Sequence, residues 1–426
     1  MSDRFPSLVA MENVQANSWT LWMERLGLFG FLLCMLGLPI SPALLSIGTV
    51  AMIVPALASR PPMEQFKRFY KDKAAFFLSL IFVVQVLSFF WTDNTEQFVE
   101  HLRIKAPLFF GLYALTVIGP FDKKWLRIGL ALFILAAFIT GTATMVDYFM
   151  HKQQYDLEIE VSKPLPIFFD INHIYFSLLL AFSVFGSFWM FRKREHFFVP
   201  AERYLWLALS IAQFAYLHVL TARTGLLGFY AAAFVLFIFY IFQRKKYLIG
   251  ALILAGFVAA PFLGYKYVPS LQYRVDNTIW DLERYFAGGD PNYLSLGMRF
   301  ESWKAAWGLF KSNPVGGVAM ADLNEEMWDQ YIRDGSLLCD NNYILPHNEF
   351  IQIAAGLGLL GLLSFGLGWF YPLFQGIKRQ GWLFWAFWIV FGFGMLGESV
   401  AERQIGVMCI VVMWMTTRWL SETYRN

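Results

Sequence analysis

Three arginines and a histidine stand out because their side chains could together bind and act on a phosphorylated group: Arg223, Arg274, Arg299 and His347. A guanidinium stays protonated and offers a planar fork of donors that matches phosphate oxygens. A histidine can accept or release a proton near neutral pH. The four residues therefore indicate a phosphate- or diphosphate-binding site with a general base, provided that the fold brings them together.

Two of these residues have a plausible structural role instead. Arg223 lies in Thr221-Ala-Arg-Thr-Gly-Leu-Leu-Gly228 and could be an arginine that reaches a membrane interface from a helix end. His347 opens His-Asn-Glu-Phe after Pro346 and could be a hydrogen-bonded structural histidine. Neither motif is specific by itself.

Further polar residues stand at predicted helix starts. His173 is a second candidate base, and Asn172 and Asn348 are candidate substrate contacts. Asn172 also fits a helix N-cap. Glu398 and Arg403 flank the last predicted turn, where they could pair with each other or line the pocket.

Composition predicts a membrane protein. Hydrophobic residues make up 58% of the chain and charged residues 15%, whereas a soluble globule carries about 25% charged residues. The 45 Phe, 16 Trp and 19 Tyr are typical of segments anchored at membrane interfaces. Three cysteines give no disulfide framework, and the first apolar run lacks the cleavage site of a signal peptide.

Apolar runs that could each cross about 30 Å of hydrocarbon recur along the chain. We predict an all-α polytopic membrane protein with about twelve transmembrane helices, at 20–39, 42–59, 74–91, 105–120, 128–149, 173–191, 203–221, 225–242, 247–264, 349–371, 382–397 and 405–420. The glycines at 356, 358 and 361 loosen the tenth and also allow close helix packing.

Clusters of Lys and Arg orient these segments. They fall in alternate loops, and short basic loops stay in the cytoplasm: 60–73, 123–127, 192–194, 244–246 and 378–379. Both termini are therefore expected in the cytoplasm, and the long loop 265–348 in the outer compartment. This divides the chain into helices one to nine (1–264), a loop subdomain (265–348) and helices ten to twelve (349–426).

The long loop is the part of the chain able to fold as a soluble subdomain. Phe300, Trp303, Trp307 and Phe310 recur at helical spacing and predict an amphipathic helix over 298–311. Asn313-Pro314 should end it, followed by a turn at Gly316-Gly317. The loop carries more acidic than basic residues, which argues against a nucleic-acid partner.

A metal site would require several convergent carboxylates. Asp93, Glu96 and Glu100 are separated and stand beside His101, Arg103 and Lys105, so we predict a solvated face and no metal or other cofactor. No Rossmann or P-loop fingerprint occurs.

The order of the motifs along the chain is similar to that of a known protein family. Arg-Thr-Gly-Leu-Leu-Gly is followed by Gly-Met-Arg-Phe-Glu-Ser-Trp, then by Asn-Pro-Val-Gly-Gly-Val and His-Asn-Glu-Phe. Over roughly residues 200–420 this resembles the superfamily of bacterial O-antigen ligases, O-antigen polymerases and O-linked oligosaccharyltransferases. The end of the chain soon after the last apolar run favours a ligase over the protein-glycosylating members, which usually have a further C-terminal domain.

The resemblance implies an activity and roles for residues. Such a ligase moves a glycan from undecaprenyl diphosphate to a sugar hydroxyl of lipid A-core on the periplasmic face of the inner membrane. In-line attack opposite the leaving group would invert the anomeric centre, and arginines can stabilise the leaving diphosphate without a metal. Arg223 and Arg299 match the family's motif arginines, and Arg274 matches less distinctively. His347 would be the base.

Two other functions stay open. An O-antigen polymerase or O-oligosaccharyltransferase of the same superfamily shares this architecture. A transporter is a different class, but it needs access from both faces, whereas the polar motifs here gather on one predicted side.

Overall fold

The structure is a computed structural model that describes residues 18–160, 164–220, 222–245, 247–267 and 269–424. These residues form helices and connecting segments and no strand. The α-helices are α1 (Ser18–Gly37), α2 (Pro42–Ala58), α3 (Pro62–Lys71), α4 (Lys73–Leu87), α5 (Thr95–Ile118), α6 (Lys123–Met150), α7 (Lys152–Glu160), α8 (His173–Arg192), α9 (Glu202–Leu220), α10 (Arg223–Arg244), α11 (Tyr247–Tyr267), α12 (Pro269–Phe286), α13 (Ser295–Ser312), α14 (Leu323–Arg333), α15 (Glu349–Phe374), α16 (Trp382–Gly397), α17 (Gln404–Met408) and α18 (Trp414–Thr423).

Each of the twelve predicted apolar segments coincides with helical structure. The last is interrupted, because the π-helical turn Cys409–Met413 joins α17 to α18. The main boundary error is at α5, which begins at Thr95 instead of near residue 105. Asn94 caps this helix by accepting a hydrogen bond from the amide of Gln97 at 3.0 Å, and hydropathy does not detect such a polar helix start.

Seven of the helices in the described residues are long and apolar enough to cross a membrane, and an eighth candidate would join α2 and α3 across a bend of 119°. The seven are α1, α4 with its 3-10 extension to Phe90, α5, α6, α8, α10 and α15. The protein is thus helical and suited to a membrane, while the count of twelve spans stays a prediction.

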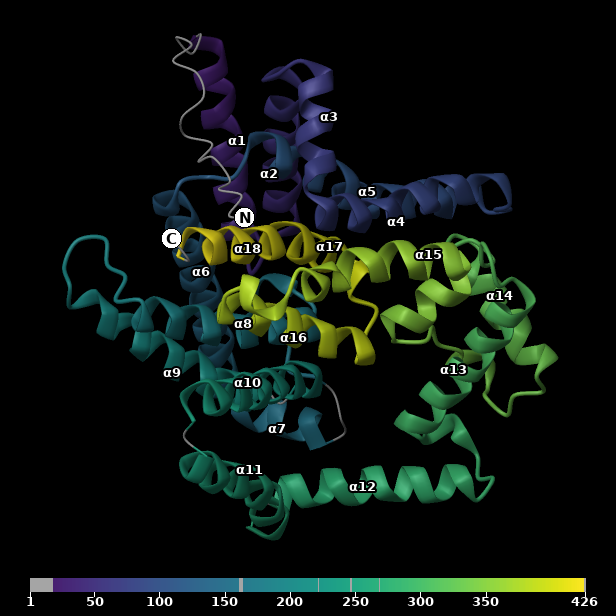
Figure 1. Cartoon of the computed structure of the whole chain (residues 1–426). Helices are drawn as coiled ribbons and strands as arrows, with labels where there is room; N and C mark the ends of the chain where they lie inside the picture. The colour runs from purple at the N-terminus through teal and green to yellow at the C-terminus, as the bar shows by residue number, and fades with distance from the viewer. Residues whose placement is uncertain (1–17, 161–163, 221, 246, 268, 425–426) are drawn as a thin grey trace.

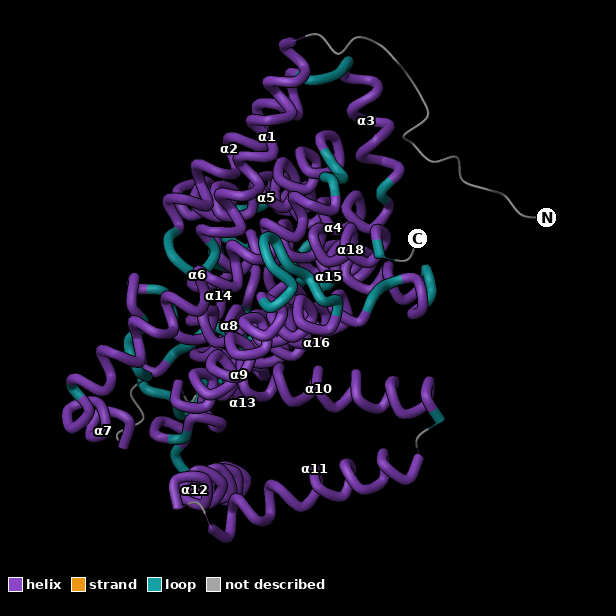
Figure 2. The backbone as a smooth tube through the Cα atoms, turned by 90° about the vertical axis from the view of Figure 1, so that its left-hand side faces the viewer, coloured by secondary structure: helices purple, strands orange, loops and turns teal. Residues whose placement is uncertain are grey.

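The core is built around α8. Buried residues make up 83% of its apolar window, the largest share among the candidate spans. In Figure 1, α8 and α16 lie in the middle of the molecule with α10 beneath them, and α11 and α12 form its lower edge in Figures 1 and 2. The ends of these central helices position the site described below.

The long segment before α15 contains α12, α13 and α14. The predicted helix over 298–311 is confirmed as α13, which is slightly longer and ends at Ser312 with Asn313 as its C-cap. Its buried face, however, is made by small residues such as Ser302, Ala305 and Ala306, while Trp307 of the aromatic stripe is 51% exposed. Close contact of helix backbones favours the small residues at this packing face.

α15 is broken at Gly358, which has φ 60° and ψ −154°. The loop after α13 replaces the missing helical hydrogen bonds. The amide of Val318 donates to the carbonyl of Ala355 at 3.0 Å, and the amide of Leu359 donates to the carbonyl of Pro314 at 2.8 Å. The glycines therefore serve to admit another segment into the helix, and not only to bring helices close.

We expect Gly358→Ala to destabilise the protein by about 1–3 kcal/mol, because an L side chain is strained at this φ. An added Cβ would also stand 2.4 Å from the carbonyl oxygen of Val315. Unfolding of the detergent-solubilised protein measures the effect. Gly366→Ala is the matched control in the same helix, since its Cβ would meet nothing within 4 Å. Equal stability of the two variants would contradict this account of the break.

Candidate active site

Ionisable side chains at the ends of several helices interact with one another. Arg223 is the first residue of α10, and His173 is the first residue of α8. Arg299 lies in the second turn of α13, His347 directly precedes the N-cap of α15, and Glu398 is the C-cap of α16. Helices that are far apart in the sequence therefore contribute side chains to one cluster.

His347 forms a hydrogen-bonded pair with Glu398. Its Nδ1 lies 3.2 Å from both carboxylate oxygens. Because a carboxylate only accepts hydrogen bonds, Nδ1 must carry a proton in this contact. In the neutral imidazole Nε2 is then the unprotonated nitrogen, which is the form that can accept a proton. The side chain of His347 is 38% exposed and that of Glu398 13%, so the pair is reachable but shielded.

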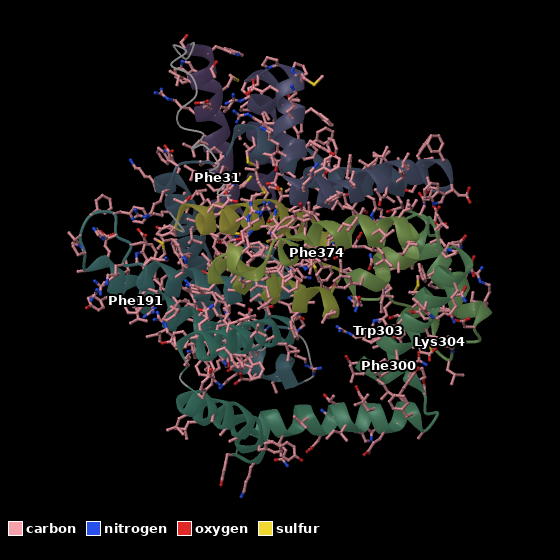
Figure 3. The ribbon with its side chains drawn as sticks, in the orientation of Figure 1. Phe31, Phe191, Phe300, Trp303, Lys304 and Phe374 are labelled. Carbon is pink, nitrogen blue, oxygen red and sulfur yellow. The ribbon has the colours of Figure 1, made fainter. Side chains whose placement is uncertain are left out.

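The backbone at His347 is in the left-handed region, with φ 45°. This conformation costs a non-glycine residue about 1–3 kcal/mol and must be held by its neighbours. On one side, the indole of Trp303, labelled in Figure 3, donates to the carbonyl of Pro346 at 2.7 Å. On the other, the side chain of Asn348 caps α15 by accepting from the amides of Phe350 and Ile351. The imidazole therefore projects from a firmly fixed turn.

Arg299 and Arg223 bring positive charge to this pair. Arg299 is half-buried, and one of its guanidinium nitrogens donates to the carbonyl of Gly397 at 3.2 Å. Burial lowers the pKa of Arg299 below its usual value; the charge of Glu398 opposes this shift, and the charge of Arg223 adds to it. Arg223 itself is exposed.

The cations at the site are incompletely neutralised. Among the residues that the structure describes, no carboxylate forms an ion pair with Arg223 or Arg299. Glu398 interacts with Arg299 electrostatically, but its close contact is with His347. Two guanidiniums beside one engaged carboxylate make a site that favours an anion.

The turn that carries Glu398 is fixed by hydrogen bonds from several elements. Asn348 donates to the carbonyl of Leu396 at 3.0 Å, and the hydroxyl of Tyr175 donates to the carbonyl of Ser399 at 3.1 Å. The buried carboxylate of Glu349 accepts from the amide of Ala401 at 2.7 Å. Together with the bond from Arg299 to Gly397, these contacts hold the turn from α8, α13 and α15.

The end of this turn is held by a buried charge cluster. The ammonium of Lys105, which is fully buried, donates to Glu402, and Nδ1 of His101 lies 3.4 Å from the same carboxylate. The predicted solvated face is confirmed for Asp93 and Glu96, which are exposed, and Glu100 pairs at 2.6 Å with Arg103, which is 76% exposed. The neighbouring His101 and Lys105 do not belong to it, because both turn toward Glu402.

The other predicted site residues occupy different positions. Asn172 caps α8 by accepting from the amide of Ile174 at 2.9 Å. His173 is half-buried and interacts electrostatically with Glu398. Both polar groups of Asn348 are engaged within the protein. Arg274 lies in α12, and its side chain is not among those described, nor is Thr221.

Glu398 is the site residue whose role sequence reasoning left undecided. Of the two alternatives considered, an ion pair with Arg403 and a place in the pocket, the contact with His347 fits the second. The sequence did indicate that Glu398 could lie near His347, because Glu398 follows an apolar segment and falls on the same predicted side of the membrane. Sequence spacing alone could not show which histidine the Glu398 carboxylate contacts.

The arrangement can bind an anionic group and accept a proton beside it. The described residues contain no group of three or more His, Cys, Asp or Glu side chains placed to hold a metal ion. Charge stabilisation by the residues in place would come from the guanidiniums and charge-assisted hydrogen bonds.

The fold and this site define a multi-pass helical membrane protein with a cluster of ionisable side chains at its helix ends. Residues 207–366 match the family model described as O-antigen ligase. This match confirms the resemblance to the O-antigen ligase and polymerase superfamily and spans Arg223, Arg299 and His347, while Glu398 lies beyond it. No curated protein matches the chain.

Proposed function

We propose that this protein is an O-antigen ligase, a glycosyltransferase that moves a glycan from undecaprenyl diphosphate to a sugar hydroxyl of lipid A-core. The observation that carries the proposal is the His347–Glu398 pair beside the guanidiniums of Arg299 and Arg223. The family match over residues 207–366 supports the donor and acceptor classes.

In this mechanism the acceptor hydroxyl gives its proton to Nε2 of His347 as its oxygen attacks the anomeric carbon. The bond from that carbon to the diphosphate oxygen breaks, and undecaprenyl diphosphate leaves with the electron pair. Arg223 and Arg299 stabilise the charge that develops on the leaving phosphate oxygens. Attack opposite the leaving group inverts the anomeric centre. Glu398 acts as a positioning residue, because it keeps the proton of His347 on Nδ1.

The proposal places the site at the periplasmic face of the bacterial inner membrane, with both termini in the cytoplasm. The basic clusters in alternate loops support this orientation. Residues 265–348 then form the periplasmic subdomain between transmembrane segments 1–264 and 349–426. Arg274, Asn172 and His173 belong to the proposed substrate-binding surface, and Asn348 shapes it by anchoring the carbonyl of Leu396. We propose that transfer needs no metal or cofactor.

The acceptor decides between ligase and polymerase, since a polymerase of the same superfamily would use the same donor. Purified protein given glycan-linked undecaprenyl diphosphate should form product when lipid A-core is added. Without the core, we expect no product. Growth of longer lipid-linked glycan in the absence of core would assign a polymerase instead.

A double-mutant cycle tests the proposed base and its partner. We expect His347→Ala to lower kcat by about 10²–10⁴, the usual contribution of a general base. Glu398→Ala should lower it less. The double variant should be no worse than His347→Ala, because Glu398 acts through the imidazole.

His151→Ala is the matched control for the cycle. His151 is also paired with a carboxylate, Asp147 at 3.2 Å, but is 51% exposed and remote in sequence from the motifs. It should retain normal turnover. Normal turnover in His347→Ala would shift the assignment of the base to His173.

Lysine substitutions separate a guanidinium fork from a simple positive charge. If Arg223 and Arg299 bind the diphosphate with two parallel donors each, Arg→Lys at either position keeps the charge but loses this geometry. We expect a loss in kcat/KM of about tenfold or more, and at least as much for Arg→Ala. Arg333→Lys is the control, since Arg333 makes an exposed ion pair with Glu326. Near-normal activity of both lysine variants would defeat the fork model.

A further inference from the structure

The short helix α3 leaves the direction of α2 at a bend of 119°. Pro61 and Pro62 lie at this bend, where they have no amide N–H with which to continue α2, and a proline is favourable at the first position of α3. At a rise of 1.5 Å per residue, the ten residues of α3 extend about 15 Å. The hydrocarbon core of a bilayer is about 30 Å thick. α3 is therefore too short to cross a bilayer by itself.

α3 and the candidate active site lie at opposite ends of the same helices. Gln404, which follows the turn after α16, donates to the hydroxyl of Ser46 near the start of α2 at 2.8 Å. The remainder of α2 extends about 18 Å before α3 follows. In α5, Lys105 reaches the turn after α16, whereas Nη1 of Arg68 in α3 lies 3.5 Å from the carbonyl of Val117 at the other end of α5. α3 thus belongs to the side of the bundle away from the site.

One face of α3 is fixed against the bundle. Phe69 is buried, and its ring packs edge-on against Tyr113 with the ring centroids 5.4 Å apart. The buried amide of Gln65 donates to a carbonyl in the last turn of α2 at 3.0 Å. Just after the helix, Asp72 accepts a hydrogen bond from Arg418 of α18 at 2.9 Å. These contacts determine which side of α3 faces outward.

The outward side carries an apolar stripe formed by Met63, Phe66 and Tyr70. Their spacing of three and four residues places them on one helix face, and the three side chains are between 48% and 66% exposed. The rings of Phe66 and Tyr70 stack with centroids 6.1 Å apart, and the ammonium of Lys73 lies over the ring of Tyr70. The described part of the chain therefore leaves an ordered aromatic surface largely uncovered.

Positive charge borders this stripe. Lys67 and Lys71 are exposed, and among the residues that the structure describes no carboxylate forms an ion pair with either of them. Glu64, the acidic residue of α3, is already paired with Arg60 at 2.9 Å and with Arg68 at 3.3 Å. The two lysines thus keep their charge for a partner outside the chain. An apolar stripe bordered by lysines is typical of a helix that lies in the surface of an anionic membrane.

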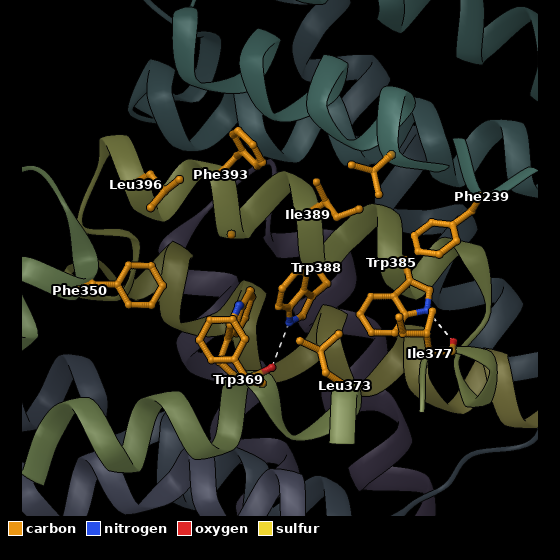
Figure 4. A pocket seen from close by; sticks show the side chains of 13 residues that line it. Phe239, Phe350, Trp369, Leu373, Ile377, Trp385, Trp388, Ile389, Phe393 and Leu396 are labelled. Carbon is orange, nitrogen blue, oxygen red and sulfur yellow. Dashed lines mark hydrogen bonds between the residues drawn. The ribbon is translucent and has the colours of Figure 1, made fainter. Parts of the chain in front are cut away.

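Figure 4 shows the contrasting case of an exposed apolar side chain on an uncharged helix. Phe393 is 46% exposed, but its helix, α16, contains no Lys, Arg, Asp or Glu. Such a helix suits the hydrocarbon core of a membrane. α3 combines aromatic and basic side chains, and this combination suits the level of the lipid head groups.

We propose that α3 is an interfacial helix that binds anionic phospholipids. The stripe of Met63, Phe66 and Tyr70 inserts between the lipids, and Lys67 and Lys71 contact the phosphates of their head groups. In the proposed orientation this is the cytoplasmic leaflet, whose surface potential is negative. The proposal goes beyond the transfer reaction and holds for a ligase and a polymerase alike.

Photo-crosslinking identifies the lipid at the stripe. Benzoylphenylalanine replaces Phe66 in the full-length protein, which is reconstituted in vesicles of equimolar phosphatidylglycerol and phosphatidylcholine, and mass spectrometry counts the crosslinked lipids. We expect anionic phosphatidylglycerol to exceed phosphatidylcholine about fivefold or more, since one lysine near an anionic surface contributes about a factor of five. Salt at about 1 M should bring the ratio toward one, because the screening length falls to about 3 Å.

Lysine variants test the source of the selectivity. Lys67→Gln combined with Lys71→Gln should bring the ratio of the two crosslinked lipids close to one. Lys304→Gln combined with Lys311→Gln is the matched control, because it removes the same charge from exposed positions of α13. This control should keep the ratio of the unsubstituted protein.

Two further positions for benzoylphenylalanine complete the experiment. Ile139 lies near the middle of α6 and is 55% exposed, so that a label there should crosslink both lipids equally. Met63 belongs to the same stripe as Phe66 and should give the same excess of phosphatidylglycerol, also in the event that the Phe66 replacement does not fold.

A ratio near one at the stripe would overturn the proposal, as would an excess of phosphatidylglycerol that persists in the variant lacking Lys67 and Lys71. Crosslinking to a second copy of the chain instead of to lipid would assign the stripe to an interface between protomers and would also overturn it. None of these outcomes affects the proposed function, because the experiment does not measure glycan transfer.

Discussion

The contact between Glu398 and His347 is the interaction on which the rest of the site depends. It places a negative charge near the guanidiniums of Arg299 and Arg223, where it offsets the repulsion between them. It also selects the imidazole nitrogen that carries the proton. Because the carboxylate is engaged by the histidine, the arginines keep an excess of positive charge toward an incoming anion. One carboxylate thus sets both the tautomer of His347 and the electrostatic character of the cluster.

Glu398 can do this because its turn is immobilised through main-chain atoms. Carbonyls at Leu396, Gly397 and Ser399 and the amide of Ala401 are each bonded to a side chain from another helix. The buried Lys105–Glu402 pair adds a charged anchor at its end. Breaking a buried pair by removing one partner is far more costly than losing an exposed one. The polar groups of this region are therefore devoted largely to holding the backbone in place.

Local patterns predicted much of this arrangement. The apolar segments correspond to helices, the helix over 298–311 was correctly placed, and Asn172 is the N-cap that its position before α8 indicated. The inward orientation of Lys105 and the buried small-residue face of α13 were not predicted, because each depends on a neighbour distant in the sequence. A charged residue is expected to be exposed to solvent unless a buried partner for it is known, and the sequence does not identify that partner. The order of the motifs was enough to propose that the arginines and His347 share one site. The contact between Glu398 and His347 could be seen only in the tertiary structure.

At the break in α15, main-chain hydrogen bonds connect this helix to the loop that follows α13. Amides and carbonyls between Ala355 and Leu360 find partners in the residues just after α13, so the loop stands in for part of a helical ladder. A residue inserted into or deleted from that loop would leave main-chain groups of α15 unpaired, and its consequences would reach the turn that holds His347. Length variation among related sequences should therefore be scarce in this apparently ordinary loop.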